Sequence, residues 1–528
     1  MKKCIALILS LAMLLALCAC GGSQQTDSES AAADSGSAAA EPAADGEKVL
    51  RIGLIESSQS FSPTDNGGLP LNLAYEFLAT TDAGGTLTPW LAESIEWVDD
   101  TTIKIVLRDG IYFQDGDQMT GEDVLYSIYY AANAVGYELS KHYVCVDFDQ
   151  SYVEDDGLTV ILKTSYVYAP LYTWLAAVCL VNKSAVQNTA SDDPSWFDTP
   201  STSSAYELVE NVDGAHCTFR ARDDYWDADN QPQWDEITFY YYSNATAMFI
   251  AFENGELDLV LKPDYKDYER ALEGDIVPAD TTSCYSVEIN SVAAVTLGSY
   301  CEYFQDPKVR EAVAHCLDAE GIAAVVYGSL VKTGMTSILA EDFTGKYESV
   351  GSFDYDVEYA KQCMAESNYP DGFTIHCVAM NTDETMMQVV QAELAEIGIE
   401  LEIEVYDFMT WIQLTQVEGS TDISVLAGTQ NFDASAALSS YSIESMLTGT
   451  RVTDPDFNEL LSAINSTVDQ DAQNELYHEL QELAYEQMWI IPLFQCSYGI
   501  VYNNTVLDCT LPATGTCAYV QFECVPVN

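Results

Sequence analysis

The hydrophobic pattern changes from helical to strand-like within residues 387–405, and this change restricts the fold class. Apolar residues first recur at helical spacing, at Met387, Val390, Leu394 and Ile397. Gly398 follows as a helix stop, and residues 399–405 then alternate strictly between apolar and acidic side chains, as in a strand with one buried face. Residues 102–107 and 158–163 also predict strands. Helix followed by strand, repeated along the chain, predicts α/β lobes.

The composition limits the classes of partner. The chain has 528 residues, enough for two or three domains, and its 11% aromatic content is too high for a disordered protein. It carries 20 Lys and Arg against 83 Asp and Glu, a formal net charge of −63. Nucleic-acid binding relies on Lys and Arg at the phosphates. The charge therefore argues against a nucleic-acid partner and opposes docking on anionic lipid.

The N-terminus predicts export and a lipid anchor. Residues 1–20 combine a basic start with a short apolar core, as in a signal peptide, and end in the sequence LCAC at positions 17–20. This ending resembles the bacterial lipobox and predicts lipidation of Cys20; the alternative is a plain secretory signal cut near Ala19. Residues 21–47 are rich in Ser, Ala and acid, which predicts a disordered tether. We therefore expect an exported protein held by lipid at the outer face of the cytoplasmic membrane.

The cysteines predict packing rather than metal binding. Three of the 15 belong to the signal region, and the other twelve are scattered singly from Cys145 to Cys524. The sequence contains no Cys-x-x-Cys and no Cys/His cluster with zinc spacing, so we expect no metal site and no cofactor. Cys509, Cys517 and Cys524 are close enough in sequence to be disulfide candidates. Most of the twelve are expected to be small buried hydrophobic residues.

Catalytic signatures are incomplete, which predicts that the chain is not an enzyme. His478 and Glu479 begin like a zinc-protease helix, but Glu482 occupies the position of the second His. Ser329 and Lys332 match a Ser-x-x-Lys nucleophile, and a Lys-Thr-Gly motif starts at the same Lys332, so one lysine would have to supply two separate groups. A secreted hydrolase whose triad assembles only in space stays open as an alternative.

Seven segments of the chain carry the motifs of one known family in the right order. The most recognisable stretch is LAESIEW at 91–97 followed by IVLRDGIYFQDG at 105–116. The other segments are 121–127, 252–258, 306–318, 354–373 and 393–406. Together they resemble the extracellular solute-binding proteins of family five, the peptide- and nickel-type receptors of ABC importers. The resemblance spans nearly all of the chain after the tether.

The resemblance implies an α/β fold with two lobes, of the periplasmic-binding-protein type (cluster C). It implies a ligand cleft between the lobes and an extra subdomain in the first lobe. The implied boundaries are lobe I at 48–76, 201–280 and 492–528, the extra subdomain at 77–200 and lobe II at 281–491. The chain would cross between the lobes near Thr281 and Pro492. Closure about a hinge would then enclose the ligand.

The same resemblance implies a set of ligand-binding residues. They are Ser57, Gln59, Thr281, Ser286, Asn381, Met386, Phe408, Thr429, Gln430 and Asp433. Asn381 belongs to a loop that lines the cleft in the family, and Asp433 lies one residue beyond the amine-binding Asp of peptide receptors. The alternative for Met386 and Phe408 is ordinary core packing.

Cations are scarce in this implied cleft. Thr415 and Val425 stand where an oligopeptide receptor has arginines. A buried ligand carboxylate needs paired charge or several donors. We therefore expect a neutral or cationic ligand, or a peptide recognised mainly through its backbone.

The function implied by the resemblance is that of a membrane-anchored extracellular receptor. It would capture a solute, a peptide or peptide-like molecule, and deliver it to the permease of an ABC importer, and it is expected to be a monomer. A peptide- or pheromone-sensing receptor of the same fold is the first alternative, and the secreted hydrolase is the second.

Overall fold

A computed structural model describes most of the chain from residue 46 onward. The described residues are 46–55, 60–64, 68–81, 86–134, 137–188, 200–276, 278–341, 343, 345, 350–415, 417, 419–426, 433–443, 445, 449–510 and 524–527. They belong to one unit of the chain, residues 40–528. Cys20, the signal segment and nearly all of the predicted tether lie outside the described residues.

The largest sheet of the described residues has nine strands. Their order is β16-β12-β17-β11-β1-β10-β9-β8, with β13 paired to β17. The strands are β1 (Val49–Leu54), β8 (Tyr206–Val212), β9 (His216–Ala221), β10 (Glu236–Tyr241), β11 (Leu259–Leu261), β12 (Thr282–Leu297), β13 (Val331–Thr333), β16 (Ile423–Leu426) and β17 (Ile490–Asn503). β1 runs parallel to both β10 and β11, so the carboxyl ends of these three strands lie at one edge of the sheet.

Three helices of the first part of the chain accompany this sheet. They are α2 (Gly68–Ala74), α6 (Ala245–Glu253) and α7 (Tyr265–Glu273). Met248 and Phe249 of α6 share a core with Tyr268 of α7 and with Val260 and Val501 of the sheet. The apolar residues of both helices are therefore buried against strands β11 and β17.

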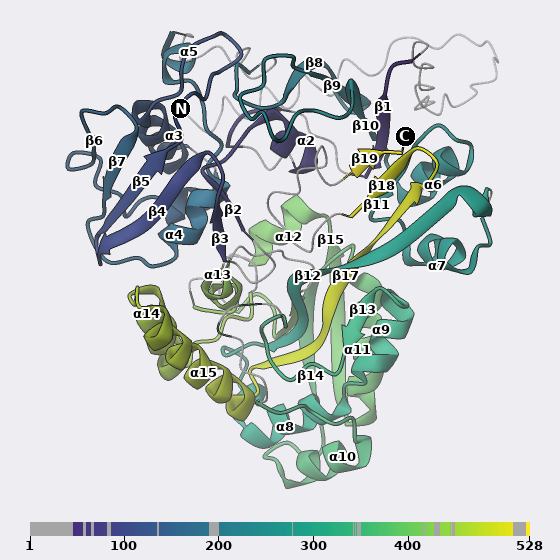
Figure 1. The fold of residues 1–528 in the computed structure, drawn as a ribbon. Helices are drawn as coiled ribbons and strands as arrows, with labels where there is room; N and C mark the ends of the chain where they lie inside the picture. The colour runs from purple at the N-terminus through teal and green to yellow at the C-terminus, as the bar shows by residue number, and fades with distance from the viewer. Residues whose placement is uncertain are drawn as a thin grey trace, which may run out of the picture. The chain divides into compact units, whose positions relative to one another are not determined.

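β12 and β17 are long enough to belong to two hydrophobic cores. Val287 of β12 and Ile500 of β17 lie in a core formed mainly with β1, β9 and β10, whereas Ile289 lies in a second core built from residues 289–496. Figure 1 shows the teal β12 and the yellow β17 running side by side, and their pairing shifts between Glu288 and Val292. The chain passes from one core to the other along these strands. We call the parts around the first and second core lobe I and lobe II.

A third core holds residues 78–180, which we call the extra subdomain. It contains a four-stranded antiparallel sheet with the order β4-β5-β7-β6. The elements are β2 (Ala79–Thr81), β3 (Leu87–Pro89), β4 (Ala92–Asp99), β5 (Thr102–Leu107), α3 (Gly121–Asn133), β6 (Tyr152–Val153), β7 (Thr159–Lys163) and α4 (Leu171–Trp174), followed by α5 (Lys183–Asn188). The strand predicted at 102–107 is confirmed at both ends, and the one predicted at 158–163 begins at Thr159.

Lobe II combines a parallel strand pair with eight helices in the described residues. β14 (Phe373–Met380) runs parallel to β15 (Ile399–Tyr406). The helices are α8 (Pro307–Cys316), α9 (Ala319–Val326), α10 (Val357–Glu366), α11 (Glu384–Glu396), α12 (Phe408–Thr415), α13 (Ala434–Ser439), α14 (Pro455–Asn465) and α15 (Gln470–Gln487). The predicted helix before Gly398 and strand after it are confirmed as α11 and β15. Ile399 and Leu401 are buried while Glu400 and Glu402 are exposed, as the alternation predicts, but Ile403 is half-buried and Val405 is exposed towards the end of the strand.

The cysteines mostly act as small core residues. Eight of the nine free cysteines in the described ranges are buried, and Cys284 is half-buried. A disulfide joins Cys509 of β18 (Leu507–Cys509) to Cys524 of β19 (Cys524–Pro526), whereas Cys517 lies outside the described residues. Within those ranges, no cluster of His, Cys, Asp and Glu could hold a metal ion. No helix there has the length and apolar composition of a membrane span.

Candidate ligand-binding site

Lobe I presents the carboxyl ends of its parallel strands at one edge of the large sheet. Ligands of open α/β sheets bind at this end of the strands. Ile55 follows β1 and is 41% exposed, and Tyr242 follows β10. The backbone N–H of Tyr242 donates to the carbonyl oxygen of Leu54 at 2.8 Å, which holds the ends of the two strands together. This edge is the part of lobe I suited to meet a ligand.

Lys262 follows β11 at the same edge and has an unusual backbone conformation. Its φ is +53°, in the left-handed region that residues with a Cβ rarely adopt, and its N–H donates to the carbonyl of Gly499 at 3.0 Å. Its Nζ lies 5.8 Å from the centroid of the Tyr498 ring, within the range of a cation–π contact. Lys262 is an exposed cation that the sequence analysis missed, because only the strand pairing places it here.

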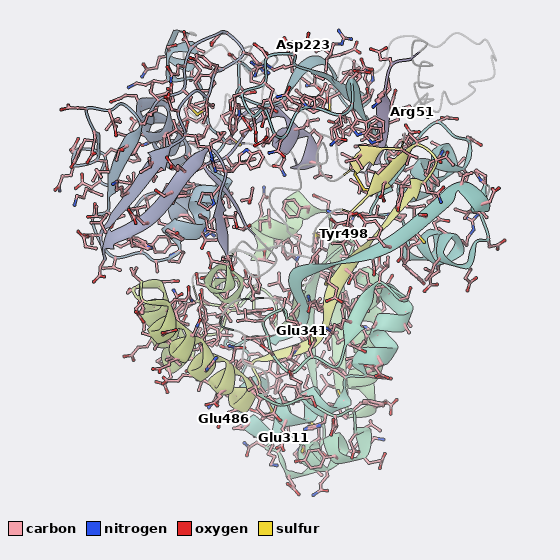
Figure 2. The ribbon with its side chains drawn as sticks, in the orientation of Figure 1. Arg51, Asp223, Glu311, Glu341, Glu486 and Tyr498 are labelled. Atoms are coloured by element: carbon pink, nitrogen blue, oxygen red, sulfur yellow. A yellow bond between two sulfur atoms is a disulfide. The ribbon has the colours of Figure 1, made fainter. Side chains whose placement is uncertain are left out.

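Tyr498 connects this edge to the rest of the molecule. Figure 2 labels it on β17, and it packs against the cores of both lobes. Burial raises the pKa of its phenol to about 12, so the ring is neutral at physiological pH. It offers Lys262 an aromatic face rather than a negative charge.

Lobe II presents a matching edge at the carboxyl ends of β14 and β15. Asn381 follows β14, is exposed, and donates its backbone N–H to the carbonyl of Tyr406 at 2.9 Å. Phe408 begins α12 just after β15 and is 55% exposed, with its ring 6.1 Å from that of the buried Trp411. An exposed phenylalanine beside a polar amide can hold a solute by apolar contact and hydrogen bonding. The structure thus brings the predicted residues Asn381 and Phe408 to one edge.

Asp383 adds a carboxylate to this edge of lobe II. It is half-buried at the start of α11, and burial raises its pKa to about 6, while a hydrogen bond from the Thr382 hydroxyl lowers it in part. A desolvated carboxylate favours a cationic partner. The sequence alone gives Asp383 no role, because the burial of its carboxylate cannot be seen in the sequence.

Met386 is a core residue rather than a ligand contact. Its side chain has no exposed surface and packs in the core of lobe II with Met387 and Val390. The reason is the helical period of α11, which turns Met386 inward together with these neighbours. The alternative of ordinary core packing is therefore correct for Met386 and wrong for the exposed Phe408.

Thr281 and Ser286 lie on the lobe I part of the crossing region. Thr281 precedes β12, and its carbonyl accepts the N–H of Asn504 at 2.9 Å. Ser286 is exposed opposite Gly499 and lies near the hydroxyl of Tyr268 on α7, where burial raises the pKa of the phenol and Ser286 lowers it in part. Neither contacts the Asn381 edge through a hydrogen bond in the described residues. Four other predicted residues lie outside that part of the chain: Ser57, Gln59, Thr429 and Gln430.

Asp433 caps a helix in this structure. Its Oδ1 accepts the N–H of Ala436 at 2.9 Å and the hydroxyl of Ser435 at 2.6 Å, which fixes the start of α13. Burial raises its pKa, hydrogen bonds from Ser435 and Ala436 lower it in part, and the nearby Trp174 indole lowers it further. Half of the carboxylate is thus committed to the helix and the other half faces an aromatic ring. The predicted role as an anchor for a ligand amine is not what the described contacts favour.

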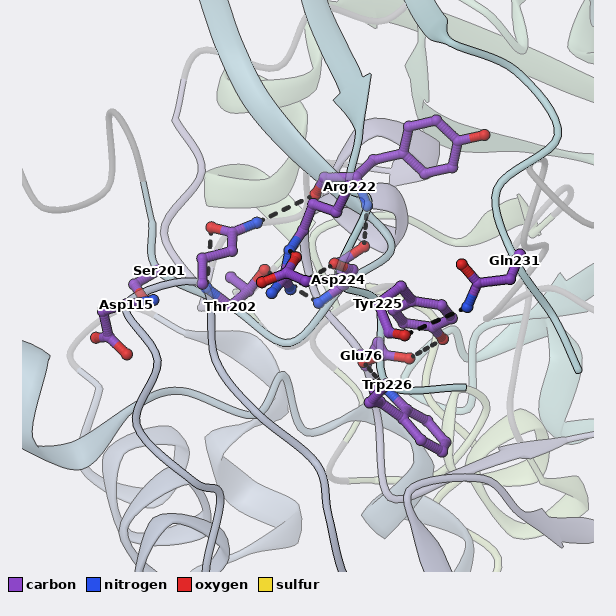
Figure 3. Close-up of polar contacts among 12 residues, drawn as sticks. Glu76, Asp115, Ser201, Thr202, Arg222, Asp224, Tyr225, Trp226 and Gln231 are labelled. Carbon is purple, nitrogen blue, oxygen red and sulfur yellow. Dashed lines mark hydrogen bonds and ion pairs between the residues drawn. The ribbon is translucent and has the colours of Figure 1, made fainter. Parts of the chain in front are cut away.

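A second buried carboxylate, Glu76, ties lobe I to the extra subdomain. Figure 3 shows it beside Tyr225 and Trp226, which donate at 2.7 Å and 3.0 Å, and the indole of Trp90 donates at 3.0 Å. Burial raises the pKa of Glu76, and hydrogen bonds from Tyr225 and the two indoles, together with the nearby Ser203 hydroxyl, lower it in part. All of these donors are neutral. Because they already occupy both oxygens, we assign Glu76 a structural role.

Lys332 of lobe II lies on β13, which pairs directly with the crossing strand β17. It lies opposite Gln495 of β17, forms an ion pair with Glu341, and has a second carboxylate, Glu288, at 4.0 Å. Two acids therefore neutralise it. A lysine held in this way is a poor partner for a ligand carboxylate.

These features define a class of protein: a two-lobed α/β binding protein whose lobes are linked by two long strands. Solved structures agree with this fold. NikA from Brucella suis in complex with Fe(III)-EDTA has a TM-score of 0.80 at 19% identity, covering 91% of this chain and 100% of that chain. AppA from Bacillus subtilis in complex with a nonapeptide has a TM-score of 0.72 at 18% identity, covering 91% and 99%.

The sequence then identifies the family. Residues 86–445 match the model of the bacterial extracellular solute-binding proteins, family 5 (middle region), and the chain belongs to this family. It is similar to the oligopeptide-binding protein AppA of Bacillus subtilis, with 26% identity over 451 residues that cover 78% of each protein. It is also similar to the nickel-binding protein NikA of Staphylococcus aureus, with 22% identity over 367 residues, 68% of this chain and 70% of that protein. Members of the family are binding proteins found outside the cytoplasm.

Proposed function

We propose that this protein captures a peptide or peptide-like solute outside the cell and delivers it to the permease of an ABC importer. The observation that carries the proposal is the pair of strand edges, one on each lobe, linked by β12 and β17. Such edges are where α/β proteins bind ligands, and motion about two shared strands can enclose one. The names of relatives support the ligand class: an oligopeptide-binding protein, and a glutathione-binding protein of Salmonella paratyphi A that is 22% identical over 419 residues.

We further propose that the protein binds its solute without converting it. The contacts of the Ser-x-x-Lys segment support this proposal. Lys332 is ion-paired with Glu341 and Glu288 rather than placed to activate Ser329. The backbone N–H of Ser329 donates to Glu269 of α7. A base already neutralised by two carboxylates is a weak proton acceptor for a serine hydroxyl. Incubating the protein with peptide mixtures should therefore leave every peptide intact by mass spectrometry.

The charge of the site favours a neutral or cationic group near lobe II. Asp383 supplies a desolvated carboxylate and Phe408 an aromatic face, whereas Lys332 is neutralised. A ligand carboxylate would depend on backbone N–H groups or on Lys262 of lobe I. Lobe II thus offers an acidic and an aromatic environment, which suits a neutral or cationic part of a peptide.

A thermal-shift screen tests this proposal. The probes are free dipeptides and tripeptides, their carboxyl-amidated forms, and neutral and cationic solutes. A binder should raise the melting temperature in proportion to RT ln(1 + [L]/Kd), and amidation should cost little if the backbone dominates recognition. A strong preference for free acids over amides would contradict the expectation of a missing carboxylate clamp and would assign that role to Lys262.

We propose that the protein is a monomer and that a diacylated Cys20 anchors it to the membrane. The motif at 17–20 and the tether composition support the lipid anchor, and a tether of about 27 residues reaches roughly 30 Å as a flexible coil. Replacing Cys20 by Ala should release the protein from the membrane fraction and abolish incorporation of labelled lipid. Retention of label in the variant would contradict the assignment.

A further inference from the structure

The extra subdomain contacts lobe II through a short segment around α4. The backbone N–H of Ala169 donates to the carbonyl of Asn465, the last residue of α14, at 2.8 Å. Ala436 of α13 packs against the core of the extra subdomain. The indole of Trp174 lies beside the carboxylate of Asp433. Two helices of lobe II therefore reach the same segment of the subdomain.

Trp174 is held in a fixed orientation on the subdomain side. It is 3% exposed, and its carbonyl accepts the hydroxyl of Tyr143 at 2.9 Å. Its ring stacks on that of His142, with centroids 3.9 Å apart and planes 13° apart, and Nδ1 of His142 is hydrogen-bonded to the hydroxyl of Tyr168 at 2.7 Å. A ring fixed by stacking and backbone contacts loses little entropy when it meets a partner.

The carboxylate of Asp433 is also held in a fixed position, on the lobe II side. Its Oδ1 is occupied by Ala436 and Ser435, so Oδ2 is the atom left to face the subdomain. Oδ2 is buried and has no hydrogen bond of ordinary geometry among the described residues, while the Trp174 indole lies close enough to lower the pKa of the carboxylate in part against the effect of burial. The contact is thus weaker than a full hydrogen bond. A weak contact between two preorganised groups can form and break as two bodies move.

We propose that Trp174 and Asp433, together with the Ala169–Asn465 hydrogen bond, form a clasp that holds the extra subdomain against lobe II. The inference rests on the proposed function in one respect, namely that the two parts separate when a solute enters or leaves. The clasp stabilises the closed form without touching the solute. A ligand shifts the equilibrium between the open and closed forms only by its differential affinity for the two. Because the clasp already favours the closed form, a smaller difference in affinity is enough for the ligand to close the protein.

A purely structural role for Asp433 makes a different prediction. Asn is as good a helix N-cap as Asp, so Asp433→Asn would be silent if Asp433 only capped α13. In the clasp, the single amide oxygen of Asn can accept from the helix or face the indole, but not both, and its NH2 group would meet the indole N–H as a second donor. The clasp therefore predicts a loss that the cap alone does not.

Hydrogen exchange of the ligand-free, full-length protein tests the clasp, read by mass spectrometry on the peptide that contains the Ala169 amide. Trp174→Phe keeps the stacking on His142 and removes the N–H. Both Trp174→Phe and Asp433→Asn should speed exchange of this amide at least tenfold. The control is Asp469→Asn, the same change at the exposed N-cap of α15, where Oδ1 accepts the N–H of Ala472 at 2.9 Å; it should leave the Ala169 amide unchanged.

Two results would overturn the clasp. One is an Ala169 amide that exchanges at the same rate in both variants as in the parent protein. The other is an amide that is already unprotected in the parent. Small-angle scattering should also show a larger radius of gyration for Trp174→Phe than for the parent. None of these readouts uses a solute, so a failed solute screen and a failed clasp are separate outcomes.

Discussion

The side-chain amide of Gln495 on β17 donates to the carbonyl oxygen of Ile289 on β12 at 3.2 Å. This hydrogen bond spans the place where the two strands slip in register, between Glu288 and Val292. Irregular pairing leaves backbone groups without ladder partners, and Gln495 satisfies one of them. Its Oε1 also accepts the N–H of Glu341 at 3.1 Å. A fully buried side chain thus stabilises the crossing between the lobes.

Replacing Gln495 by Leu should destabilise the fold markedly. The change removes the part-buried hydrogen bond from the N–H of Glu341 and leaves the buried carbonyl of Ile289 without its Gln495 donor, and the second loss costs about 1–3 kcal/mol. Urea denaturation gives the change in unfolding free energy. Gln388→Leu, on the exposed side of α11, is the matched control and should change stability by less than about 0.5 kcal/mol. Equal effects of the two substitutions would contradict the role of Gln495.

The substitutions Phe408→Ala and Met386→Ala distinguish an exposed ligand-binding residue from a buried core residue. Phe408 is 55% exposed and Met386 is fully buried. Phe408→Ala should leave the melting temperature unchanged and weaken binding of whichever peptide scores in the thermal-shift screen. Met386→Ala should cost about 2–5 kcal/mol of stability through the cavity it creates. Intact binding by Phe408→Ala would remove Phe408 from the site.

Two glycines that begin the parallel strands of lobe II should differ sharply in tolerance. Gly372 and Gly398 both have positive φ, +79° and +84°. Adding a Cβ at either position therefore costs about 1 kcal/mol in backbone strain. A Cβ on Gly372 would in addition run into the backbone carbonyl of Gly398, whereas one on Gly398 meets Gly372 at an ordinary 3.6 Å. Gly372→Ala should therefore cost several times more than Gly398→Ala in thermal denaturation. Similar costs would show that the two turns do not approach each other closely.

Glu393 should make the protein less stable as the pH rises. Burial, with the charges of Asp318 and Glu396, raises its pKa to about 7, and a hydrogen bond from the N–H of Asp318 lowers it in part. Because the folded pKa lies above the unfolded value of about 4.3, the folded form binds more protons between these values. Its stability therefore falls as the pH rises through that window.

Glu393→Gln isolates this effect. The amide oxygen can still accept from Asp318, at 3.1 Å in the parent, but it carries no charge. The stability advantage of the variant over the parent should be about 1 kcal/mol larger at pH 8 than at pH 5, after allowance for solvent screening. Denaturant titrations at the two pH values give the comparison. A constant difference across pH would show that Glu393 titrates normally.

The sequence predicts the elements of this fold where a periodic pattern is strong. Helix α11, strand β15 and strand β5 follow from apolar spacing, because local burial dictates both the pattern and the structure. The burial of most cysteines follows from their scattered positions and apolar character. The order of the family motifs predicts the two-lobed architecture.

The sequence does not predict contacts between distant segments. Trp90, Tyr225 and Trp226 donate to Glu76 from 14, 149 and 150 residues away, and no local pattern connects them. Lys262 reaches the site edge through the pairing of β11, and Asp433 meets Trp174 only through tertiary packing. Met386 and Phe408 were alike in sequence as apolar residues near the implied cleft. The orientation of α11 and α12 separates them.

Native mass spectrometry of the purified protein tests most directly whether this chain is a solute receptor. The protein is measured as isolated, and again after unfolding, removal of small molecules, refolding and incubation with an equimolar mixture of di- and tripeptides. A receptor should bind one solute per chain without a covalent bond and release it with unchanged mass when unfolded. A protein that binds none of these peptides, or that returns them cleaved, would contradict the proposed function.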